Sequence, residues 1–227
     1  MPIAIITGAS RGLGLALARS LAEQGWMLVI DARGRRELEQ AADELSAMTE
    51  VAALPGDITA PEHREALLVA AGKTIDVLVN NASLLGPSPP PRLDEYPVDR
   101  LASVYAVNVL APLALTQLVL PRMPQDGRII NVTSDAAVEA YDGWGGYGSS
   151  KAALEQLSAV LAAEQPSLRV YAVDPGDMRT RMQQEAFPGE DISDRPWPQE
   201  SVPGLLALIE GQLPSGRYRA REVKVPA

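Results

Sequence analysis

Short apolar runs alternate with longer stretches of helical periodicity along almost the whole chain. The runs are rich in Val, Ile and Leu and show no alternation of polar and apolar positions, which is typical of strands covered on both faces. Strands are predicted at residues 4–7, 27–31, 51–54, 77–80, 128–132 and 168–173. Helices are predicted around them at residues 12–24, 35–49, 61–71, 98–122, 147–164 and 201–210. This alternation predicts an α/β fold with a doubly wound parallel sheet.

Proline and glycine positions agree with these boundaries. Pro61 suits the first turn of a helix, where its missing N–H is not needed, and Gly25 suits the cap after the helix at 12–24. A seventh strand is expected at 217–225, at the end of the sheet. The 227 residues contain no internal repeat and no long linker, so a single domain over 1–227 is expected.

Composition argues against several classes of protein. With 46% hydrophobic and 22% charged residues the sequence is ordinary for a globular protein. No uninterrupted apolar run approaches the roughly 18 residues of a membrane span, so no membrane partner is expected. A net charge of −9 argues against a nucleic-acid partner, because the 20 basic residues form no large cluster. The chain has no cysteine and enters its first strand too early for a signal peptide, so a cytoplasmic location is expected.

The same composition narrows the possible chemistry. Because cysteine is absent and His63 is the only histidine, thiol nucleophiles, cysteine-ligated zinc and the usual Ser-His triads are disfavoured, and no metal site is expected. Tyr147 and Lys151 lie one helical turn apart, and Ser134 lies thirteen positions before the tyrosine. An ammonium on the same helix face can lower the pKa of a phenol, which is ordinarily about 10. These three residues are therefore candidates for acid–base chemistry without histidine.

The first predicted strand runs directly into a glycine-rich turn that opens the first helix. Gly8, Gly12 and Gly14 have the spacing GxxxGxG. Glycines let the backbone approach a pyrophosphate closely, and the free N–H groups at the start of a helix favour its negative charge. A glycine-rich turn without a ligand is the alternative, but the strand before it and the helix after it favour a dinucleotide site.

In order and spacing, the motifs of this chain resemble those of the short-chain dehydrogenase/reductase family. They are Thr7 to Gly14 (TGxxxGxG), Asp57-Ile58, Asn80-Asn81-Ala82, Asn108, Ser134, Tyr147 to Lys151 (YGSSK), and Pro175-Gly176 followed by Thr180. Each motif alone is weak, whereas their arrangement over nearly the whole chain is specific. The resemblance implies a Rossmann-type sheet of about seven strands. It also implies an NAD(P)H-dependent oxidoreductase that interconverts a carbonyl and an alcohol on a small-molecule substrate.

The resemblance assigns roles to four side chains. Tyr147 is expected to donate a proton in reduction and to accept it in oxidation. Lys151 is expected to lower the pKa of that phenol and to hold the nicotinamide ribose. Ser134 is expected to hydrogen-bond the substrate oxygen, and Asn108 to hold a water that links Lys151 to solvent. Independently of the resemblance, an amide within an apolar helix needs hydrogen-bond partners.

Cofactor contacts follow from the same resemblance. They are expected at Gly8, Ser10, Arg11, Gly12, Leu13, Gly14, Arg33, Asp57, Ile58, Asn81, Ala82, Ser83, Tyr147, Lys151, Pro175, Gly176, Met178 and Thr180. Asp57 and Ile58 are expected beside the adenine, the stretch 81–83 beside the ribose, and the stretch 175–180 beside the nicotinamide. Ser83 departs from the family's usual glycine in the motif NNAG. Serine is small, so it would be unfavourable there only if the backbone required a positive φ, which glycine adopts easily.

The end of the second strand bears on which nicotinamide cofactor is bound. An acidic side chain there accepts hydrogen bonds from the adenosine ribose, whereas an arginine accommodates a 2′-phosphate. The family places the acid seven residues after Gly25, which here is Ala32, followed by Arg33. Asp31 is expected to point to the opposite side, because strand side chains alternate. With Arg11 also in the glycine turn, NADP(H) is favoured over NAD(H); a register shift of one residue would restore Asp31 as a marker of NAD.

Residues 177–200 interrupt the alternation of strands and helices. They contain three prolines and several charges without a clear period, and such a segment inside a compact domain is usually a functional lid, with disorder as the alternative. Its expected apolar contributors to a substrate pocket are Met178, Met182, Phe187 and Trp197. Asp135, Tyr141 and Trp144 are expected to shape the same pocket, although loop packing explains any one of them equally well.

Two rival functions fit parts of this pattern. A non-catalytic dinucleotide-sensing protein could use the same fold, but it would not need the set Asn108, Ser134, Tyr147 and Lys151. An epimerase or dehydratase of the extended relatives generally begins with a different glycine turn and is longer.

The helices at 98–122 and 147–164 carry small and apolar residues on more than one face. Family members commonly pair through these two helices, so the resemblance predicts a homodimer or homotetramer. Packing of both helices on the sheet explains much of the same pattern.

Overall fold

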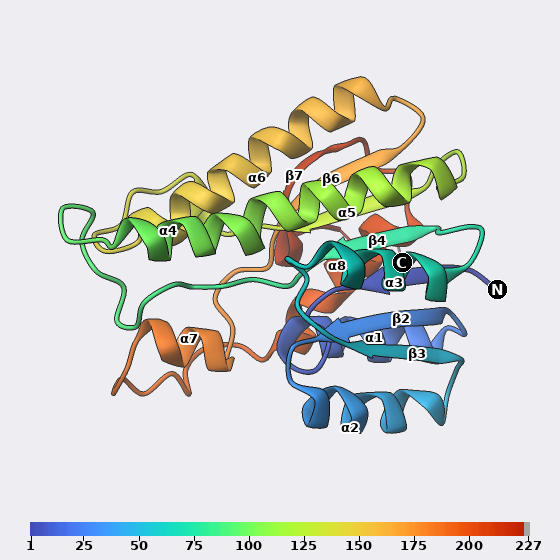
Figure 1. The fold of residues 1–227 in the computed structure, drawn as a ribbon, viewed down its shortest axis with the longest axis horizontal. Coiled ribbons are helices and arrows are strands. Elements are labelled where there is room, and N and C mark those ends of the chain that lie inside the picture. Colours follow the sequence, from blue (N-terminus) through green and yellow to red (C-terminus); the bar gives the residue numbers. More distant parts are fainter. Residues whose placement is uncertain (225–227) are drawn as a thin grey trace.

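The computed structural model describes residues 1–224 and confirms the predicted doubly wound α/β fold. Seven strands form one sheet in the order β3-β2-β1-β4-β5-β6-β7, and every neighbouring pair is parallel (Figure 1). The strands are β1 (Ile3–Ile6), β2 (Met27–Ala32), β3 (Val51–Pro55), β4 (Val77–Asn80), β5 (Arg128–Val132), β6 (Arg169–Asp174) and β7 (Gly216–Arg219). The first six are the strands predicted from the apolar runs, with their ends displaced by at most one residue.

Helices follow the strands in alternation. They are α1 (Gly12–Glu23), α2 (Arg35–Ser46), α3 (Pro61–Ala71), α4 (Val98–Tyr105), α5 (Ala111–Val119), α6 (Gly145–Glu164), α7 (Arg181–Ala186) and α8 (Val202–Glu210). Pro61 begins α3, as predicted, and Gly25 follows α1 with φ of 79°, a backbone angle that glycine adopts easily. The largest difference in a helix end is in α2, which stops three residues before its predicted end at 49.

The two faces of the sheet are both covered, which explains the continuous apolar runs. Ala4 and Ile6 of β1 pack on one face with residues of α1, α2 and α8. Ile5, between them in sequence, packs on the opposite face with residues of α3, α5 and α6. Because successive strand side chains point to opposite faces, each residue of a central strand needs an apolar partner.

The helix predicted at 98–122 is not continuous. A π-helical turn (Ala106–Leu110) separates α4 from α5, and a 3-10 turn (Leu120–Arg122) follows. The π-helical turn carries Asn108, whose amide makes four hydrogen bonds to groups outside this helix. A π-helical turn inside an α-helix is frequently found at a functional site.

The same run, Val98–Arg122, is long and apolar enough to cross a membrane by length and composition. The sequence was searched for an uninterrupted stretch of apolar residues, and this run is not uninterrupted because single polar residues such as Asn108 divide it. In this fold the run packs against α6, α3 and β4. Core helices of globular proteins pass the same test, so the run is weak evidence for a membrane segment.

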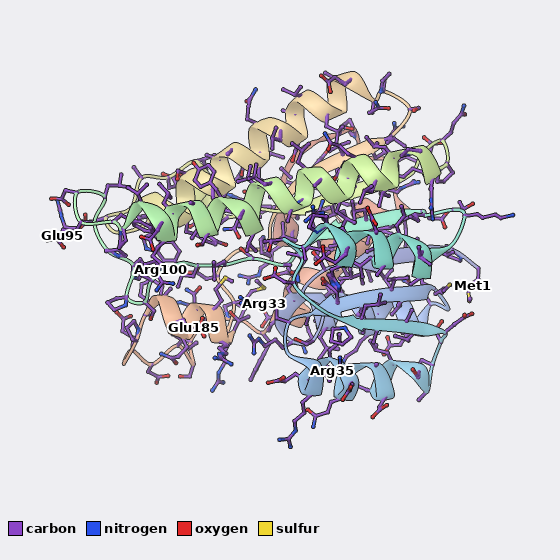
Figure 2. All side chains as sticks on the ribbon, in the orientation of Figure 1. Met1, Arg33, Arg35, Glu95, Arg100 and Glu185 are labelled. Carbon is purple, nitrogen blue, oxygen red and sulfur yellow. The ribbon has the colours of Figure 1, made fainter. Side chains whose placement is uncertain are left out.

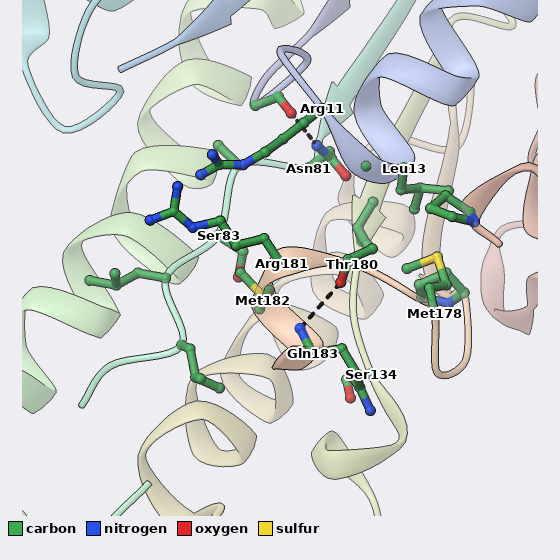
Figure 3. Close-up of a pocket in the computed structure, with 18 of the residues that line it drawn as sticks. Arg11, Leu13, Asn81, Ser83, Ser134, Met178, Thr180, Arg181, Met182 and Gln183 are labelled. Atoms are coloured by element: carbon green, nitrogen blue, oxygen red, sulfur yellow. Dashed lines mark hydrogen bonds between the residues drawn. The ribbon is translucent and has the colours of Figure 1, made fainter. Parts of the chain in front are cut away.

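The segment 177–200 is more regular than its sequence suggests. It contains α7 and the beginning of a 3-10 turn (Pro198–Ser201). The Thr180 hydroxyl caps α7 by accepting a hydrogen bond from the Gln183 backbone N–H at 3.2 Å (Figure 3). A helix of six residues is too short to show a repeating pattern of apolar residues. The capping threonine is therefore the only local sequence signal for this helix.

The last strand is shorter than predicted. β7 ends at Arg219 and a 3-10 turn (Ala220–Glu222) follows, while the predicted end at position 225 lies outside the described residues. The chain turns here to bury Ala220 against Gly204 of α8, where a Cβ on the glycine would lie 1.8 Å from the Ala220 carbonyl oxygen. Close packing on α8 therefore replaces further pairing with β6.

Candidate active site

The sheet order reverses between β1 and β4, and the candidate site lies at this point. Strands β2 and β3 lie on one side of β1, whereas β4 and all later strands lie on the other. Ligands of open α/β sheets bind in the crevice beyond the carboxyl ends of the strands at such a reversal. A cavity of about 1200 Å³ lies there, lined by the segments that follow β1 to β6 and by α7. Figure 1 shows α7 standing apart from the helical layers on this side of the sheet.

Nearly all of the residues predicted from the sequence line this cavity. Only Gly14 and Asn108 do not. Gly14 is buried in the first turn of α1, and Asn108 is 1% exposed behind Ser83. The expected lid residues Met178, Met182, Phe187 and Trp197 line the cavity as well. Figure 3 shows Arg11 and Asn81 at one end of this site and Ser134 at the other.

The glycine turn is fitted closely against the segment after β4. Gly8 and Gly12 have φ of 67° and 59°, angles that other residues rarely adopt. A Cβ on Gly8 would lie 2.9 Å from the Ala82 Cα atom. The Asn81 side chain donates hydrogen bonds to the carbonyl oxygens of Thr7 at 2.8 Å and of Gly8 at 3.1 Å. The amide of Asn81 thus holds the glycine turn in place.

Thr7 joins the same two segments and was not assigned a role from the sequence. Its hydroxyl donates to the Val79 carbonyl oxygen at 3.3 Å and accepts from the backbone N–H groups of Asn81 and Ala82, both at 3.0 Å. The signal was present, because Thr7 opens the TGxxxGxG motif.

The Asp31 side chain is buried, and both Asp31 and Ala32 border the cavity, so the expected separation onto opposite sides is not clear-cut here. Its carboxylate accepts a hydrogen bond from the Gly8 backbone N–H at 2.8 Å and lies 3.0 Å from Nε2 of His63. Both side chains are buried. The only histidine of the chain therefore supports the glycine turn through Asp31, a contact over 32 positions that no local motif indicates.

Arg33 lies at the rim of the cavity, where β2 ends. Figure 2 shows it on the same side of the molecule as Glu185 of α7 and opposite Met1. Arg33 is exposed and makes no ion pair with any residue from 1 to 224, whereas Arg35 pairs with Glu39. A hydrogen bond from the Thr59 N–H holds the pKa of Asp57 below its ordinary value, and the nearby Arg33 charge acts in the same direction.

Helix α6 places Tyr147 and Lys151 one turn apart on the face toward the cavity. The Lys151 Nζ atom lies 5.4 Å from the centre of the Tyr147 ring and donates a hydrogen bond to the Val132 carbonyl oxygen at 2.7 Å. Ser134, two residues after that carbonyl, also lines the cavity. The structure thus brings together three of the four residues predicted to carry the chemistry.

Burial dominates the acid–base properties of this pair. It lowers the pKa of Lys151 to about 7 and raises the pKa of the Tyr147 phenol above its ordinary value. The Ser83 hydroxyl acts against the rise by hydrogen bonding, whereas the carboxylates of Asp135 and Asp174 add to it. The net direction is opposite to the lowering expected from Lys151 alone. The largest cause is desolvation of the phenol itself, which spacing along the helix does not reveal.

Asn108 holds the loop after β4 against helix α6. Its Oδ1 atom accepts from the Ser83 hydroxyl at 3.2 Å and from the Leu84 N–H at 2.8 Å. Its Nδ2 group donates to the Leu84 carbonyl oxygen at 2.9 Å and to the Ser150 hydroxyl at 3.0 Å. The partners that an amide in an apolar helix needs are therefore present. Ser150 was not predicted as a site residue, although it belongs to the YGSSK motif.

The Ser134 hydroxyl is paired with its neighbour in the chain. It donates to Asp135 Oδ1 at 2.9 Å, and the Tyr141 hydroxyl donates to Asp135 Oδ2 at 3.1 Å. The Trp144 ring lies 5.8 Å, centre to centre, from both Tyr147 and Phe187. An aromatic wall with a carboxylate at its base therefore adjoins Tyr147, as expected for a pocket shaped by these loops.

A half-buried polar cluster supports the residues that follow β5. Glu155 accepts hydrogen bonds from the Thr133 hydroxyl at 2.7 Å and from Arg217 Nε at 2.9 Å. Arg217 also donates to the Ser134 carbonyl oxygen at 3.3 Å. The cluster fixes the backbone on either side of the Ser134 side chain. It joins β5, α6 and β7, and no local sequence signal could have revealed it.

Comparison with known proteins decides the family. A sequence model described as short chain dehydrogenase matches residues 2–191. The chain belongs to the short-chain dehydrogenase family. This confirms the resemblance carried by the motifs, because the match runs from the glycine turn past Thr180.

Two similar proteins are named as reductases. The L-xylo-3-hexulose reductase of Hypocrea jecorina is 36% identical over 214 residues, covering 82% of this chain and 69% of that protein. The sepiapterin reductase of Bos taurus is 32% identical over 201 residues, covering 81% of this chain and 75% of that protein.

Solved structures of the family are similar over nearly the whole chain. A short chain dehydrogenase from Shigella flexneri complexed with NADP has a TM-score of 0.89 and 29% identity, covering 97% of each chain. One from Escherichia coli complexed with NADPH has a TM-score of 0.87 and 29% identity, covering 97% of this chain and 96% of the other.

The cavity fits the nicotinamide dinucleotide that short-chain dehydrogenases bind. Its floor is the glycine turn at the start of α1, where Gly8 and Gly12 have positive φ and the N-cap residue Arg11 makes no side-chain capping hydrogen bond. Its volume of about 1200 Å³ is large enough for a dinucleotide together with a small substrate.

Replacing Gly14 by alanine is expected to abolish dinucleotide binding. A Cβ at this position would lie 2.6 Å from the Gly8 carbonyl oxygen and from the Asn81 amide, so the glycine turn would have to move. Gly216→Ala is the matched control, because its Cβ would make only ordinary contact with Tyr218 at 3.7 Å. Tryptophan fluorescence titration with NADPH and thermal unfolding measure both variants. Binding retained by Gly14→Ala would contradict this reading of the turn.

Proposed function

We propose that this short-chain dehydrogenase is an NADP(H)-preferring carbonyl reductase, or the reverse alcohol dehydrogenase. The observation that supports this most is the presence of Tyr147, Lys151 and Ser134 in the cavity that the glycine turn also lines. The bound dinucleotide supplies or accepts the hydride. The chain itself has to supply the proton, orient the substrate oxygen and exclude water.

Tyr147 is the proposed general acid in reduction and general base in oxidation. Its ring is half-buried, packs edge-on against Trp144 and lines the cavity, where a substrate can reach the phenol. Lys151 is proposed to hold the nicotinamide ribose and, when protonated, to favour the phenolate through its charge. Asn108 is proposed to hold a water that links Lys151 to solvent.

Ser134 is proposed to hydrogen-bond the substrate oxygen. In the structure its hydroxyl donates to Asp135, and rotation about one bond would turn the hydrogen toward the cavity. Tyr141 and the Ala136 N–H also donate to Asp135, so the carboxylate keeps partners when Ser134 turns away. The aromatic wall formed by Trp144 and Phe187 would then lie beside the group attached to the carbonyl carbon.

The charges at the adenosine end favour NADP(H) over NAD(H). Asp31, the one carboxylate at the end of β2, is engaged by Gly8 and His63. Ala32 follows it, and the guanidinium of Arg33, which pairs with no acidic residue among 1–224, lies at the rim of the cavity. An arginine suits a 2′-phosphate because it offers several N–H donors and a permanent charge.

Arg33→Ala is expected to raise the KM for NADPH by about 10- to 100-fold, the loss of one or two charge-assisted hydrogen bonds. The KM for NADH should change little, since NADH lacks the 2′-phosphate. Arg35→Ala is the matched control, because Arg35 pairs with Glu39. Steady-state kinetics with both cofactors give the comparison. A wild-type protein that prefers NADH, or equal effects of the two substitutions, would refute the assignment.

The reaction class is tested by consumption of NADPH with a panel of ketones, aldehydes and quinones. A carbonyl reductase oxidises NADPH only when a carbonyl compound is added. A dinucleotide sensor binds NADPH without consuming it, and an epimerase or dehydratase changes its substrate with no net consumption. Binding without turnover across the panel would favour the sensor.

Other expected properties follow from the same proposal. Residues 177–200 are proposed to form the lid of the substrate pocket, since α7 stands over the cavity. A homodimer or homotetramer is proposed through the helical run 98–122 and α6, where Leu110 and Val160 are 58% and 43% exposed. A cytoplasmic location is proposed as well.

A further inference from the structure

The end of the cavity where the substrate is proposed to bind contains a carboxylate without a cationic partner. Four carboxylates line the part of the cavity formed after β5, around the end of β6 and by α7: Asp135, Asp174, Asp177 and Glu185. Arginine side chains pair with the last three of them, at N–O distances of 3.5, 3.6 and 2.8 Å. Asp135 makes no ion pair with any residue from 1 to 224. Its negative charge is therefore the one in this group that the described part of the chain does not balance.

The Asp135 carboxylate accepts three hydrogen bonds, which fix its position. Its Oδ1 atom accepts from the Ser134 hydroxyl at 2.9 Å and from the Ala136 N–H at 2.8 Å. Its Oδ2 atom accepts from the Tyr141 hydroxyl at 3.1 Å. An ionised carboxylate has about four acceptor positions, so these three donors leave one position open on Oδ2. All three donors are neutral groups.

Binding of a carbonyl compound would change this set of donors. When Ser134 turns its hydrogen to the substrate oxygen, as proposed, Oδ1 of Asp135 loses one of its two donors. The carboxylate then has an open acceptor position on each oxygen, next to the hydroxyl that holds the carbonyl group. A half-buried acceptor that loses its donor costs free energy. A substrate with a donor of its own beside the carbonyl group would replace the hydrogen bond that Ser134 gives up.

We propose that Asp135 is a specificity-determining residue that selects substrates with a protonated amine beside the carbonyl group. The inference rests on the proposed function and deepens it by naming a substrate class: α-amino ketones in reduction, or 1,2-amino alcohols in oxidation. An ammonium group supplies the missing donor and also the positive charge that the three neutral donors do not provide.

The neighbouring wall of the cavity suits the rest of such a substrate. Tyr141, Trp144 and Phe187 line the cavity, and the rings of Trp144 and Phe187 lie 5.8 Å apart, centre to centre. Aromatic faces attract cations and provide apolar contact area. The bond changes remain those of the proposed reduction. The carbonyl carbon gains the hydride, the carbonyl oxygen gains the Tyr147 proton, and the ammonium group keeps its three protons.

The test uses three ketones of similar size. These are α-aminoacetophenone, α-hydroxyacetophenone and propiophenone, which carry an ammonium, a hydroxyl or a methyl group at the same position. The assay uses NADPH at a slightly acidic pH, which keeps the amine protonated. The wild-type protein should have a kcat/KM for the amine about 10- to 100-fold above that for propiophenone, with the hydroxy ketone between them. Because an ammonium group also activates a neighbouring carbonyl, the part due to Asp135 has to come from a variant.

Asp135→Asn keeps the shape of the side chain and removes its charge. The preference for the amine over propiophenone, taken as the ratio of the two kcat/KM values in the same protein, should fall about 10- to 100-fold. A general loss of turnover through the altered contact with Ser134 affects both ketones and cancels in this ratio. Asp142→Asn is the matched control, because the exposed Asp142 pairs with Arg92 at 3.0 Å and does not line the cavity. Its ratio should equal that of the wild-type protein.

A second measurement covers the case in which Asp135→Asn turns over none of the three ketones. Tryptophan fluorescence titration with the same ketones, in the presence of NADP⁺, gives the ratio of their dissociation constants without turnover. Trp144 and Trp197 both line the cavity and can report this binding. The ratio should again fall in Asp135→Asn and stay unchanged in Asp142→Asn.

The outcomes separate this inference from the proposed function. A wild-type protein that reduces propiophenone or α-hydroxyacetophenone as well as the amine overturns the role of Asp135 and leaves the proposed function standing. A ratio that is unchanged in Asp135→Asn, or that falls equally in Asp142→Asn, has the same consequence. If the wild-type protein reduces no carbonyl compound with NADPH, the proposed function fails, and the inference fails with it.

Discussion

Tyr147→Phe is expected to lower turnover by about 10²- to 10⁴-fold, the usual contribution of a positioned acid or base. The change removes a single oxygen atom. The ring is retained and still packs edge-on against Trp144, at 5.8 Å between centres. Binding of NADPH should remain close to that of the wild-type protein, because its phosphates are assigned to the glycine turn and Arg33. A loss of turnover without a loss of binding identifies the phenol as the source of the proton.

The control for this variant is Tyr218→Phe. Tyr218 lies in β7 and donates its hydroxyl to the Pro214 carbonyl oxygen at 2.8 Å near the surface, so its loss should leave turnover unchanged. NADPH oxidation with the best carbonyl compound of the panel gives turnover, and fluorescence titration gives the dissociation constant. Similar losses in the two variants would point to a general effect on folding and count against Tyr147 as the acid.

The strands could be predicted because burial on both faces leaves a direct trace in the sequence. Residues such as Ala4, Ile5 and Ile6 are apolar without alternation, and each one has a partner in the helical layers. The helix ends were less certain, since the end of a helix such as α2 depends on a few exposed residues. The fold class follows from the order of these patterns and does not depend on their exact ends.

The π-helical turn around Asn108 and the short helix α7 illustrate what the pattern does not show. A wider helical turn changes the phase of the buried face without changing composition, so the run at 98–122 reads as one helix. Helix α7 has six residues, fewer than two full turns, and no period can emerge from it. Thr180, a residue type that favours the N-cap position, was the only local sequence signal for α7.

The sequence predicted which residues form the site better than it predicted the hydrogen bonds that hold them in place. Motif spacing indicates which residues gather at the carboxyl ends of the strands, and almost all of them line one cavity. The support of Gly8 by Asp31 and His63 depends on residues far apart in sequence, so no motif indicates it. The net rise of the Tyr147 pKa was not predicted, for a related reason. Spacing identifies Lys151 as a neighbour, whereas only the three-dimensional structure gives the burial that acts on both groups.

Lys151→Met is expected to abolish turnover and also to change how stability depends on pH. Lys151 is buried, and its pKa falls from the ordinary 10.5 to about 7 in the folded protein. Between these two values the unfolded chain binds a proton that the folded protein does not. The free energy of unfolding of the wild-type protein therefore rises as pH increases from about 7 to 10.5 through this group. Below about pH 7 both states are protonated, and the full cost of the buried charge is present.

The difference between the wild-type protein and Lys151→Met isolates this effect. Methionine carries no charge and fills a similar volume, so its contribution to stability has no slope in this range. Relative to the variant, the wild-type protein should gain on the order of a few kcal/mol between neutral and alkaline pH. Urea unfolding of the protein without added cofactor, at several pH values, measures the difference. All other titrating groups are common to both proteins.

The exposed Lys73 provides the matched control. Lys73→Met removes the same charge from the surface, where water solvates both states, so its unfolding curves should stay parallel to those of the wild-type protein at every pH. Parallel curves for Lys151→Met would mean that the buried ammonium is fully compensated, for example by its hydrogen bond to the Val132 carbonyl oxygen. A converging pair of curves would instead show that the protein keeps a destabilising group in its core, which selection for the proposed role of Lys151 in proton transfer and ribose binding explains and selection for stability does not.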